Sequence, residues 1–552
     1  MFNKTRIPST LPHYYGRRLL SRRNNFIRLT LAALLLLSSF YFTILKPWVE
    51  SDDSRIISKI DSSTKNDASD NNSAQKSWKI NLNDTINSRV SVFNKEQFTD
   101  EAIKKNGLIP VTAVLIGWKR MESLQVVVNF ISKYPYIKEI LIWNNNDKIR
   151  LHKQDFRLNN TEVRLKIFNS DENLHDLSKY TTCAMAKYDY CYFQDDDWLN
   201  LYMDSIYTNF LRYPNLIHSN TMPIIHLEHR RWMFSNNDKN LHTGFTWLGC
   251  GSFIPRIKVQ RFLGQIGLYS LEKERLRLVD MYFSLWTNQY PYQLSNPLTT
   301  LDQSEGWSNS VDQWAVVYGN ILDAVQKLYT ALAVNTGSEQ FERQEEKPYY
   351  LDRDVRTPCI NDKCLFITNI DPFPQPSSVC YANNITHVRE HEAEFNALDF
   401  PSNEFWNKHA YHKAVDLDLN TCWNSFKKPK VDDYFGLQFV EPQNFHKITI
   451  VSSKDISNFD ISFIIKSSLD GQNWRICDKI SSSEKIKFSS IIPPNHVVAI
   501  NFNCDIKKKN HESLENLENP ENMEYRYIKF QIVRNFTEPF EICSLILDGL
   551  SV

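Results

Sequence analysis

The sequence predicts an α/β domain followed by an all-β sandwich, both behind one N-terminal transmembrane helix. An apolar run from Leu29 to Leu45, preceded by a basic segment, predicts the helix. Alternating strand and helix patterns after residue 106 predict the α/β domain. Short alternating runs after residue 379 predict the sandwich. The 552 residues exceed what a single hydrophobic core supports, so two domains are expected.

The N-terminal segment carries basic residues and no acidic ones, whereas acidic residues follow the apolar run. This asymmetry predicts a cytoplasmic tail at 1–28 and a signal anchor at 29–45. A cleaved signal peptide is the alternative, but the bulky stretch Phe40-Tyr41-Phe42 is a poor cleavage site. We therefore expect a single-pass type II protein of the Golgi or endoplasmic reticulum membrane, with its folded domains in the lumen.

The remaining boundaries follow from composition. Residues 46–105 are rich in Ser, Asn, Asp and Lys and predict a disordered stem. The α/β domain is expected at 106–345, a proline-containing linker at 346–378 and the sandwich at 379–552. Glycosylation sequons agree with a lumenal location, and they begin at Asn71, Asn83, Asn159, Asn384 and Asn535. Most of the 10 cysteines follow residue 358, which predicts disulfides whose pairing stays open. The net charge of zero gives no reason to expect a nucleic-acid partner.

Three strands of the first domain are predicted at 109–116, 137–143 and 188–194, with a helix from Met121 to Lys133. This strand–helix–strand order predicts a parallel sheet, whose ligand crevice lies at the carboxyl ends of its strands. Polar side chains follow those ends, namely Arg120, Asn144 and Asp195-Asp196-Asp197.

The acidic triplet Asp195–Asp197 indicates a metal site. Adjacent carboxylates repel one another unless a cation relieves the repulsion. Hard oxygen ligands suit Mg²⁺ or Mn²⁺, and such an ion can hold a diphosphate and neutralise it as a leaving group. A solvated turn at a helix N-terminus is the alternative. The motifs on either side favour the metal and predict nucleotide-sugar chemistry.

Five motifs in this domain, taken in order, resemble the exostosin-like glycosyltransferases, a retaining family with the GT-A fold. They are Leu115–Arg120, Ile142–Asn145, Phe193–Asp197, Trp247–Phe253 and Val279–Ser284. The resemblance covers residues 107 to 345. It implies transfer of a sugar, an N-acetylhexosamine in this class, from a UDP-sugar to a glycan or glycoprotein acceptor, with Mn²⁺ or Mg²⁺ as cofactor.

The resemblance also implies roles for the matched residues. Asp280 would be catalytic, beneath the anomeric carbon, and Asp197 would bind the metal. The nucleotide-sugar would be held by Arg120, Asn144, Asn173, Asp195, Asp196, Gly249 and Gly251. There are two departures from the family pattern. An Arg-rich stretch of the family is Leu174–Ser178 here, and Val279 replaces an acidic residue.

Some of these residues have other interpretations. Asp280 could be an ordinary acid at a helix N-terminus, stabilised by the helix dipole. Asp312 is a rival catalytic acid or a helix cap. A basic cluster, His226, His229 and Arg230-Arg231, is expected to be a solvated loop rather than a ligand set.

In the second domain, four stretches resemble the discoidin (factor V/VIII type C) jelly roll: Ala414–Trp423, Tyr434–Leu437, Ser468–Trp474 and Tyr525–Phe530. The resemblance implies binding of glycans or lipid headgroups by loops at one end, without catalysis. Asp416, Asp418 and Asn420 could offer oxygens to Ca²⁺ or could form a loop held by its own hydrogen bonds. Trp406 and Tyr411 could stack on a sugar or pack in the core.

The sequence thus predicts a membrane-anchored, metal-dependent glycosyltransferase. The alternative is a catalytically degenerate transferase-like protein that acts as a glycan-binding (lectin) or adhesion protein, which the two departures favour. The residues leave open the donor sugar, the acceptor, the ligand of the second domain, the oligomeric state and the choice between front-side and double displacement.

Overall fold

The computed structural model describes residues 86–304, 313–334, 341, 353–379, 388–454, 462–484, 496–504 and 524–547. Residues from Ile86 to Val552 form one compact unit. The predicted tail, the predicted span, Asp312, Cys380 and the sequons at Asn71, Asn83 and Asn384 lie outside the described residues. Within those ranges, no helix combines the length and the apolar character needed to cross a bilayer.

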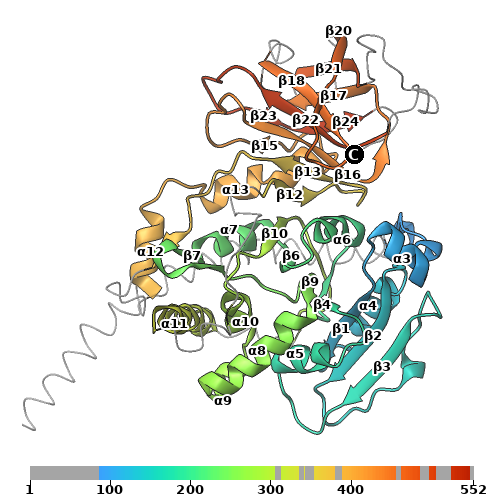
Figure 1. Ribbon diagram of the computed structural model, residues 1–552, viewed down its shortest axis with the longest axis vertical. Helices are drawn as coiled ribbons and strands as arrows, with labels where there is room; N and C mark the ends of the chain where they lie inside the picture. The colour runs from blue at the N-terminus through green and yellow to red at the C-terminus, as the bar shows by residue number, and fades with distance from the viewer. Residues whose placement is uncertain are drawn as a thin grey trace, which may run out of the picture. The chain divides into compact units, whose positions relative to one another are not determined.

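The first half of this unit is built on a mixed seven-stranded sheet with the order β10–β6–β9–β4–β1–β2–β3 (Figure 1). Its strands are β1 (Val111–Gly117), β2 (Ile137–Asn144), β3 (Arg164–Asn169), β4 (Tyr190–Gln194), β6 (His218–Thr221), β9 (Ser252–Pro255) and β10 (Tyr292–Ser295). Strand β9 is antiparallel to both of its neighbours, and the other pairs are parallel. The carboxyl ends of all strands but β9 therefore lie at one edge of the sheet.

The helices of this half are α4 (Met121–Ile131), α5 (Leu177–Ala184), α6 (Met203–Arg212), α7 (Pro223–Arg231), α8 (Arg256–Tyr269), α9 (Lys273–Leu276), α10 (Asp280–Trp286) and α11 (Gln313–Val334). Helix α4 forms where the apolar residues recur with helical spacing, and it buries Leu124, Val127 and Val128. Two short sheets complete this half, β5 (Trp198–Leu199) with β11 (Thr299–Thr300), and β14 (Ser377–Ser378) with β7 (Met233–Asn236) and β8 (Leu241–Gly244). The predicted α/β class, its three strands and its first helix are confirmed.

The folded unit begins earlier than the predicted end of the stem. Residues up to 105 were expected to be disordered, but η2 (Lys95–Phe98) and α3 (Asp100–Asn106) form there. Phe93 and Phe98 pack edge-on or tilted against Tyr136 and Tyr207. A few aromatic residues thus dock a segment whose average composition is polar.

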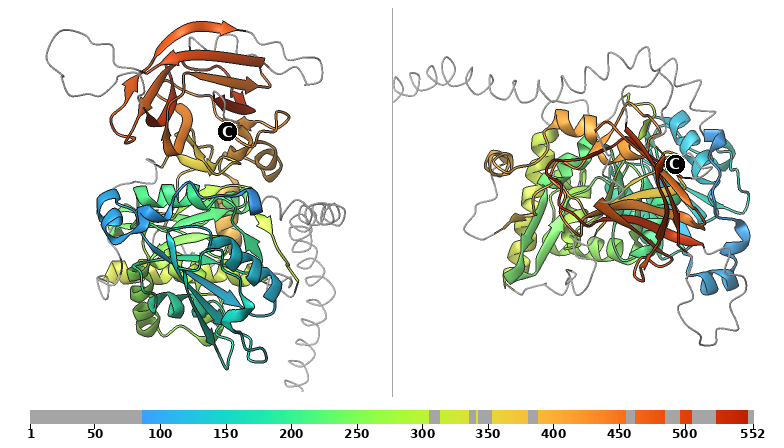
Figure 2. Two further views of the ribbon diagram at one scale, coloured as in Figure 1. Left: turned by 90° about the vertical axis from the view of Figure 1, so that its right-hand side faces the viewer. Right: turned by 90° about the horizontal axis from the view of Figure 1, so that it is seen from above.

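The second half is the all-β sandwich that the sequence predicts (Figure 2). Its six-stranded sheet contains β12 (Val355–Pro358), β13 (Cys364–Thr368), β16 (Tyr434–Gln443), β22 (Tyr525–Ile532), β18 (Phe463–Ser468) and β19 (Arg475–Ile476). The four-stranded sheet contains β20 (Asp478–Glu484), β21 (His496–Asn503), β17 (Lys447–Ser452) and β24 (Ser544–Leu547). Phe435 and Phe530 of one sheet share a core with Ile450 and Ile500 of the other.

Smaller elements complete this half. Helices α12 (Val388–Asn396) and α13 (Asn403–His409) and the single-turn η8 (Tyr411–Ala414) precede the pair β15 (Trp423–Asn424) and β23 (Glu541–Ile542).

Strands β12 and β13 stand where the sequence predicted a linker. Strand β13 pairs with β16 along its whole length, from Cys364 to Thr368. Phe366 is fully buried in the sandwich core. Its apolar run, Cys364–Ile367, is too short to stand out among the surrounding prolines, which explains why composition alone indicates a linker.

The connection between β12 and β13 also reaches the α/β half. The Asp362 carboxylate accepts hydrogen bonds from the backbone N–H groups of Asp204 and Ser205, at 3.0 and 2.9 Å. These N–H groups lie in the first turn of α6 and have no acceptor within the helix. An acidic side chain is a favourable acceptor for them.

Four disulfides join described cysteines: Cys183–Cys191, Cys359–Cys364, Cys422–Cys543 and Cys477–Cys504. The prediction of disulfides is confirmed, and Cys359 and Cys364 pair with each other. Among the described cysteines, only Cys250 is free.

This arrangement predicts where the sandwich can be cut from the chain. A fragment from residue 379 onward lacks β12 and β13, which exposes the β16 edge and removes Phe366 from the core. It should show no near-UV circular dichroism and should aggregate, whereas a fragment from residue 353 onward should keep a near-UV signal. Cooperative unfolding of the shorter fragment under oxidising conditions would contradict this description of the sheet.

Candidate functional site

The predicted site residues meet at the carboxyl edge of the α/β sheet. Arg120 follows β1, and Asp195–Asp197 follow β4. The Asp195 backbone N–H donates to the Gly249 carbonyl at 2.7 Å, which brings in the loop before β9. This edge is where α/β sheets bind their ligands.

Gly249 and Gly251 allow the close approach of that loop. A Cβ atom at Gly249 would lie 1.9 Å from an Asp195 carboxylate oxygen. Gly251 has φ of +104°, and a Cβ atom there would lie 2.7 Å from the Tyr192 hydroxyl. Both positions therefore require glycine, since a larger residue would push the loop away from β4.

Arg120 neutralises one side of the acidic triplet. Its Nη2 lies 2.5 Å from Asp196 Oδ1, and its Nη1 lies 3.3 Å from Asp197 Oδ2. Burial raises the pKa of Asp196 to about 7 and that of Asp197 to about 6, although Arg120 opposes both shifts. The two carboxyl groups therefore change charge near neutral pH.

Lys179, on α5, lies on the other side of the cluster. Its Nζ lies 3.1 Å from Asp195 Oδ1, 3.2 Å from Asp280 Oδ2 and 3.5 Å from Asp176 Oδ1. Burial lowers the pKa of the Lys179 ammonium, but the surrounding carboxylates outweigh it and hold that pKa well above the usual value. Lys179 is thus the charged group that links the triplet to the predicted catalytic acid.

Asp280 is the first residue of α10 and is 1% exposed. Its Oδ1 accepts a hydrogen bond of 2.7 Å from the Tyr180 hydroxyl. Burial raises the pKa of Asp280, while Lys179 and Tyr180 act in the opposite direction. The structure therefore brings Asp280 to the triplet, as the sequence predicts. No sequence motif marks Lys179, Tyr180 or Asp176, and the only signal is their place on, or directly before, the helix that precedes β4.

The carboxylates at this edge of the sheet are possible ligands of a divalent cation. Among the described residues, no three His, Cys, Asp or Glu side chains are grouped as metal ligands. Mg²⁺ and similar ions are, however, often held by one or two carboxylates together with substrate phosphates. Asp197 Oδ1 is buried and accepts no hydrogen bond. This oxygen fits a metal that arrives with a diphosphate, and not a site made by protein ligands alone.

Asn144 and Asn173 act within their own loops. The buried Asn144 amide donates to the Ile149 carbonyl and to Asn169 Oδ1, at 2.5 and 2.9 Å. The exposed Asn173 accepts a hydrogen bond of 2.8 Å from the His175 N–H. Their contact with a nucleotide stays a prediction.

The basic cluster is not a solvated loop, and that expectation was wrong. His226, His229 and Arg230 lie on α7 and are buried. Burial lowers the pKa of His229 to about 3, so its imidazole is neutral. Arg230 forms an ion pair of 2.9 Å with Asp371. Apolar neighbours that are distant in sequence, such as Phe373 beside His226, make this environment.

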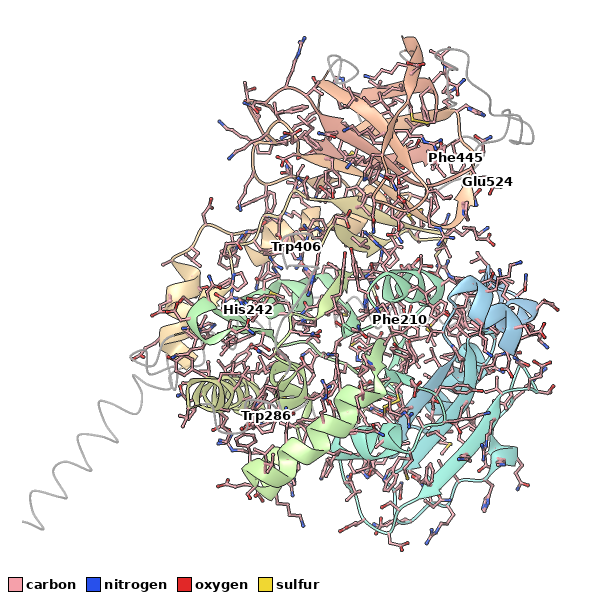
Figure 3. All side chains as sticks on the ribbon, viewed as in Figure 1. Phe210, His242, Trp286, Trp406, Phe445 and Glu524 are labelled. Carbon is pink, nitrogen blue, oxygen red and sulfur yellow. A yellow bond between two sulfur atoms is a disulfide. The ribbon has the colours of Figure 1, made fainter. Side chains whose placement is uncertain are left out.

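The proposed sugar-stacking residues of the sandwich lie in its core. Trp406 is 1% exposed and Tyr411 is fully buried (Figure 3 labels Trp406). The Trp406 indole N–H donates to the Pro223 carbonyl at 2.7 Å. Both side chains therefore pack in the core, which is the alternative to sugar stacking.

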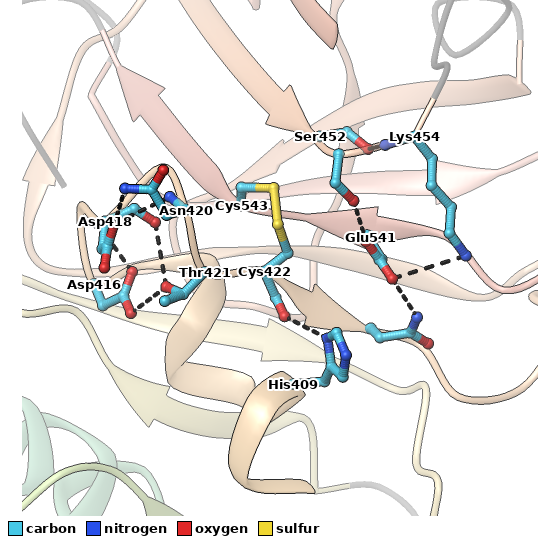
Figure 4. The surroundings of a disulfide bond; sticks show 12 residues. His409, Asp416, Asp418, Asn420, Thr421, Cys422, Ser452, Lys454, Glu541 and Cys543 are labelled. Atoms are coloured by element: carbon cyan, nitrogen blue, oxygen red, sulfur yellow. Dashed lines mark hydrogen bonds and ion pairs between the residues drawn. A yellow bond between two sulfur atoms is a disulfide. The ribbon is translucent and has the colours of Figure 1, made fainter. Parts of the chain in front are cut away.

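The loop from Asp416 to Thr421 is held by its own hydrogen bonds (Figure 4). Asp416 accepts from the Asp418 N–H and the Thr421 hydroxyl, and Asp418 accepts from the Asn420 N–H. These contacts favour a loop that is held by its own hydrogen bonds over a Ca²⁺ site.

No family model matches the chain, and no curated protein matches it. Among solved structures, CpGH89CBM32-5 from Clostridium perfringens, in complex with GalNAc-β-1,3-galactose, is 16% identical with a TM-score of 0.17, and the match covers 26% of this chain and 84% of that one.

Two other solved structures from C. perfringens are similar to a comparable degree. CBM32-1 from a family 31 glycoside hydrolase is 19% identical, with a TM-score of 0.17 and coverage of 24% and 81%. The family 32 CBM of NanJ, in complex with galactose, is 12% identical, with a TM-score of 0.16 and coverage of 25% and 85%. At TM-scores this low, the likenesses assign neither a fold nor a function to this chain.

The Lys179 contacts predict a large loss of stability in Lys179→Met. Removing the ammonium leaves Asp195 and Asp280 facing each other without a counter-charge, which should cost about 3–5 kcal/mol in the free energy of unfolding. Lys408→Met is the control, because its exposed pair with Glu404 should contribute under about 1 kcal/mol. Urea unfolding measures both, and equal losses would contradict the bridging role.

The raised pKa of Asp196, about 7, predicts a pH-dependent effect of Asp196→Asn. An acid whose folded pKa is raised binds more protons in the folded state, so its contribution to stability falls as pH rises between the unfolded and folded pKa values. The variant lacks this contribution. It should therefore gain stability relative to the native protein as pH rises from about 4 to about 7. Urea unfolding that shows a constant difference across this range would contradict the raised pKa.

Proposed function

We propose that this chain is a glycosyltransferase that takes a sugar from a UDP-sugar. The observation that carries the proposal is the convergence of Arg120, Lys179, Asp280 and the acidic triplet at the ligand-binding edge of the sheet. Such a mixture of carboxylates and fixed cations suits a metal-bound diphosphate next to a sugar that develops positive charge.

The roles follow from the contacts. Asp197 would hold Mn²⁺ or Mg²⁺ through its unpartnered oxygen, and the bound ion would neutralise the departing diphosphate. Arg120 keeps Asp196 and Asp197 together and can turn its guanidinium to phosphate oxygens. Asp280, oriented by Tyr180, would stabilise the oxocarbenium-like charge on the donor sugar.

A glycan-binding protein with an inactive transferase-like half is the second candidate. Asp280 is almost fully buried, and Lys179 and Tyr180 engage its two oxygens. A donor sugar reaches this acid only when Lys179 moves. In this candidate the sandwich would bind the glycan, as the discoidin resemblance implies.

The cellular setting of the proposal rests on sequence alone. The apolar run from Leu29 to Leu45 would anchor the chain in a Golgi or endoplasmic reticulum membrane, with the catalytic half in the lumen. The sequon at Asn159 would then be glycosylated, since its side chain is on an exposed segment of the α/β half.

One experiment separates the two candidates. The full-length protein is incubated with a panel of UDP-sugars and Mn²⁺, and free UDP is measured with and without glycan acceptors. A transferase releases UDP from one donor class and does so faster with an acceptor. No release from any donor, together with retained glycan binding, would support the second candidate.

If the protein is a transferase, Asp280→Asn should lower turnover by about 10²–10³-fold, the usual cost of losing one electrostatic group in the transition state. UDP affinity should stay nearly unchanged, because the effect is confined to the transition state. Asp312→Asn is the comparison variant and should at most raise the Michaelis constant for the acceptor. Near-normal turnover in Asp280→Asn with complete loss in Asp312→Asn would move the catalytic acid to residue 312.

A further inference from the structure

The outer face of the six-stranded sheet carries a group of cationic and aromatic side chains. Side chains alternate across a strand, so Phe435, Ile465 and Phe530 point into the core while their neighbours face outward. On β22 the outward residues include Lys529, whose partners in register are Gly436 on β16 and Lys466 on β18. This face belongs to neither the acidic cluster nor the loop from Asp416 to Thr421.

Lys529 lies between two aromatic rings. Its Nζ is 3.8 Å from the centroid of the Trp474 ring and 4.7 Å from that of the Tyr434 ring. Both rings are fixed, since the Trp474 indole N–H donates to the Gly471 carbonyl and the Tyr434 hydroxyl donates to Asp354, each at 3.0 Å. The aromatic faces attract the ammonium and hold it in place.

Lys466 lies directly across from Lys529 in the strand pair. Like charges in opposed positions of a sheet destabilise it. Within the described part of the chain, no ion pair joins either ammonium to a carboxylate. The nearby Asp354 is held by Arg212 at 3.4 Å and by Tyr434. Burial, and then the charge of Lys466, lower the pKa of Lys529.

A purely structural role accounts for only part of this arrangement. A lysine stem can cover apolar sheet surface while its ammonium reaches water. That role explains one lysine, but it does not explain two opposed ammonium groups beside fixed, partly exposed rings. An anion placed between the two ammonium groups would remove their repulsion and form charge-assisted hydrogen bonds.

We propose that this face binds an acidic glycan, whose carboxylate or sulfate group pairs with Lys466 and Lys529 while a sugar ring packs against Trp474. The apolar C–H face of a pyranose suits the exposed part of an indole. Two lysines on a chain with zero net charge do not form the long basic stripe that tracks a nucleic acid. The site is remote in the fold from Asp280, so it does not depend on the transferase reaction.

The test measures binding of the full-length protein to a sulfated oligosaccharide, a heparin hexasaccharide, and to a neutral galacto-oligosaccharide of equal length. The native protein should prefer the acidic sugar, and the preference should weaken as salt screens the charges. The double variant Lys466→Gln/Lys529→Gln should bind the acidic sugar at least about tenfold more weakly, since charge-assisted hydrogen bonds are lost. Lys466→Arg/Lys529→Arg keeps both charges, and because a guanidinium also stacks on aromatic rings and pairs with carboxylates, this variant should keep the preference for the acidic sugar.

Lys408→Gln/Lys447→Gln removes the same charge from α13 and β17 and is the matched control. An equal loss of binding in this control would overturn the site. Equal binding of the neutral sugar, or equal competition by a DNA duplex or by phosphatidylserine vesicles, would overturn recognition of an acidic glycan. UDP release, measured in parallel, should be the same in the Gln double variant and the native protein, which separates failure of this site from failure of the transferase proposal.

Discussion

The candidate site depends on the ion pairs of the buried Lys179 ammonium group. Three carboxylates from different segments approach it: Asp176 beside α5, Asp195 after β4, and Asp280 on α10. A charge taken out of water is stabilised only when it is paired and hydrogen-bonded, and here each carboxylate supplies part of that pairing. The same ammonium keeps Asp195 and Asp280 from repelling each other, so it fixes how the triplet and the proposed catalytic acid are placed.

The two halves of the folded unit are joined through their secondary structure. Strands β12 and β13 belong to the sandwich, yet Asp362 between them caps the first turn of α6 in the α/β half. Arg212, at the end of the same helix, donates to Gln438 of β16 at 3.0 Å. Contacts at both ends of α6 therefore couple the sandwich to the α/β half.

The sequence predicted those elements whose apolar pattern is local. Strands β1, β2 and β4 and helix α4 were recognised because their apolar residues are contiguous or regularly spaced. Strand β6, with the sequence His-Ser-Asn-Thr, is fully buried but polar, so no hydrophobic period marks it. Strand β13 has a short apolar run, which does not stand out among the prolines around it.

The candidate site was predictable only where residues follow strand ends. Asp195–Asp197 and Arg120 could be placed at one edge because parallel strands bring their carboxyl ends together. Lys179 could not, because a lysine within a helix usually reaches solvent, and only the fold shows the acids around it. For the same reason the sequence predicts a solvated loop at His226 and leaves sugar stacking open for Trp406 and Tyr411, although residues distant in sequence bury all three.

The proposed function requires that this sheet edge bind a nucleoside diphosphate together with a divalent cation. Titration calorimetry of UDP with the full-length protein, with and without Mn²⁺, measures that binding. We expect UDP to bind only with Mn²⁺, and to bind at least about tenfold more weakly to Asp197→Asn, since that variant loses the carboxylate that would hold the ion. UDP binding that is independent of Mn²⁺, or unchanged in Asp197→Asn, would rule out this role of the sheet edge.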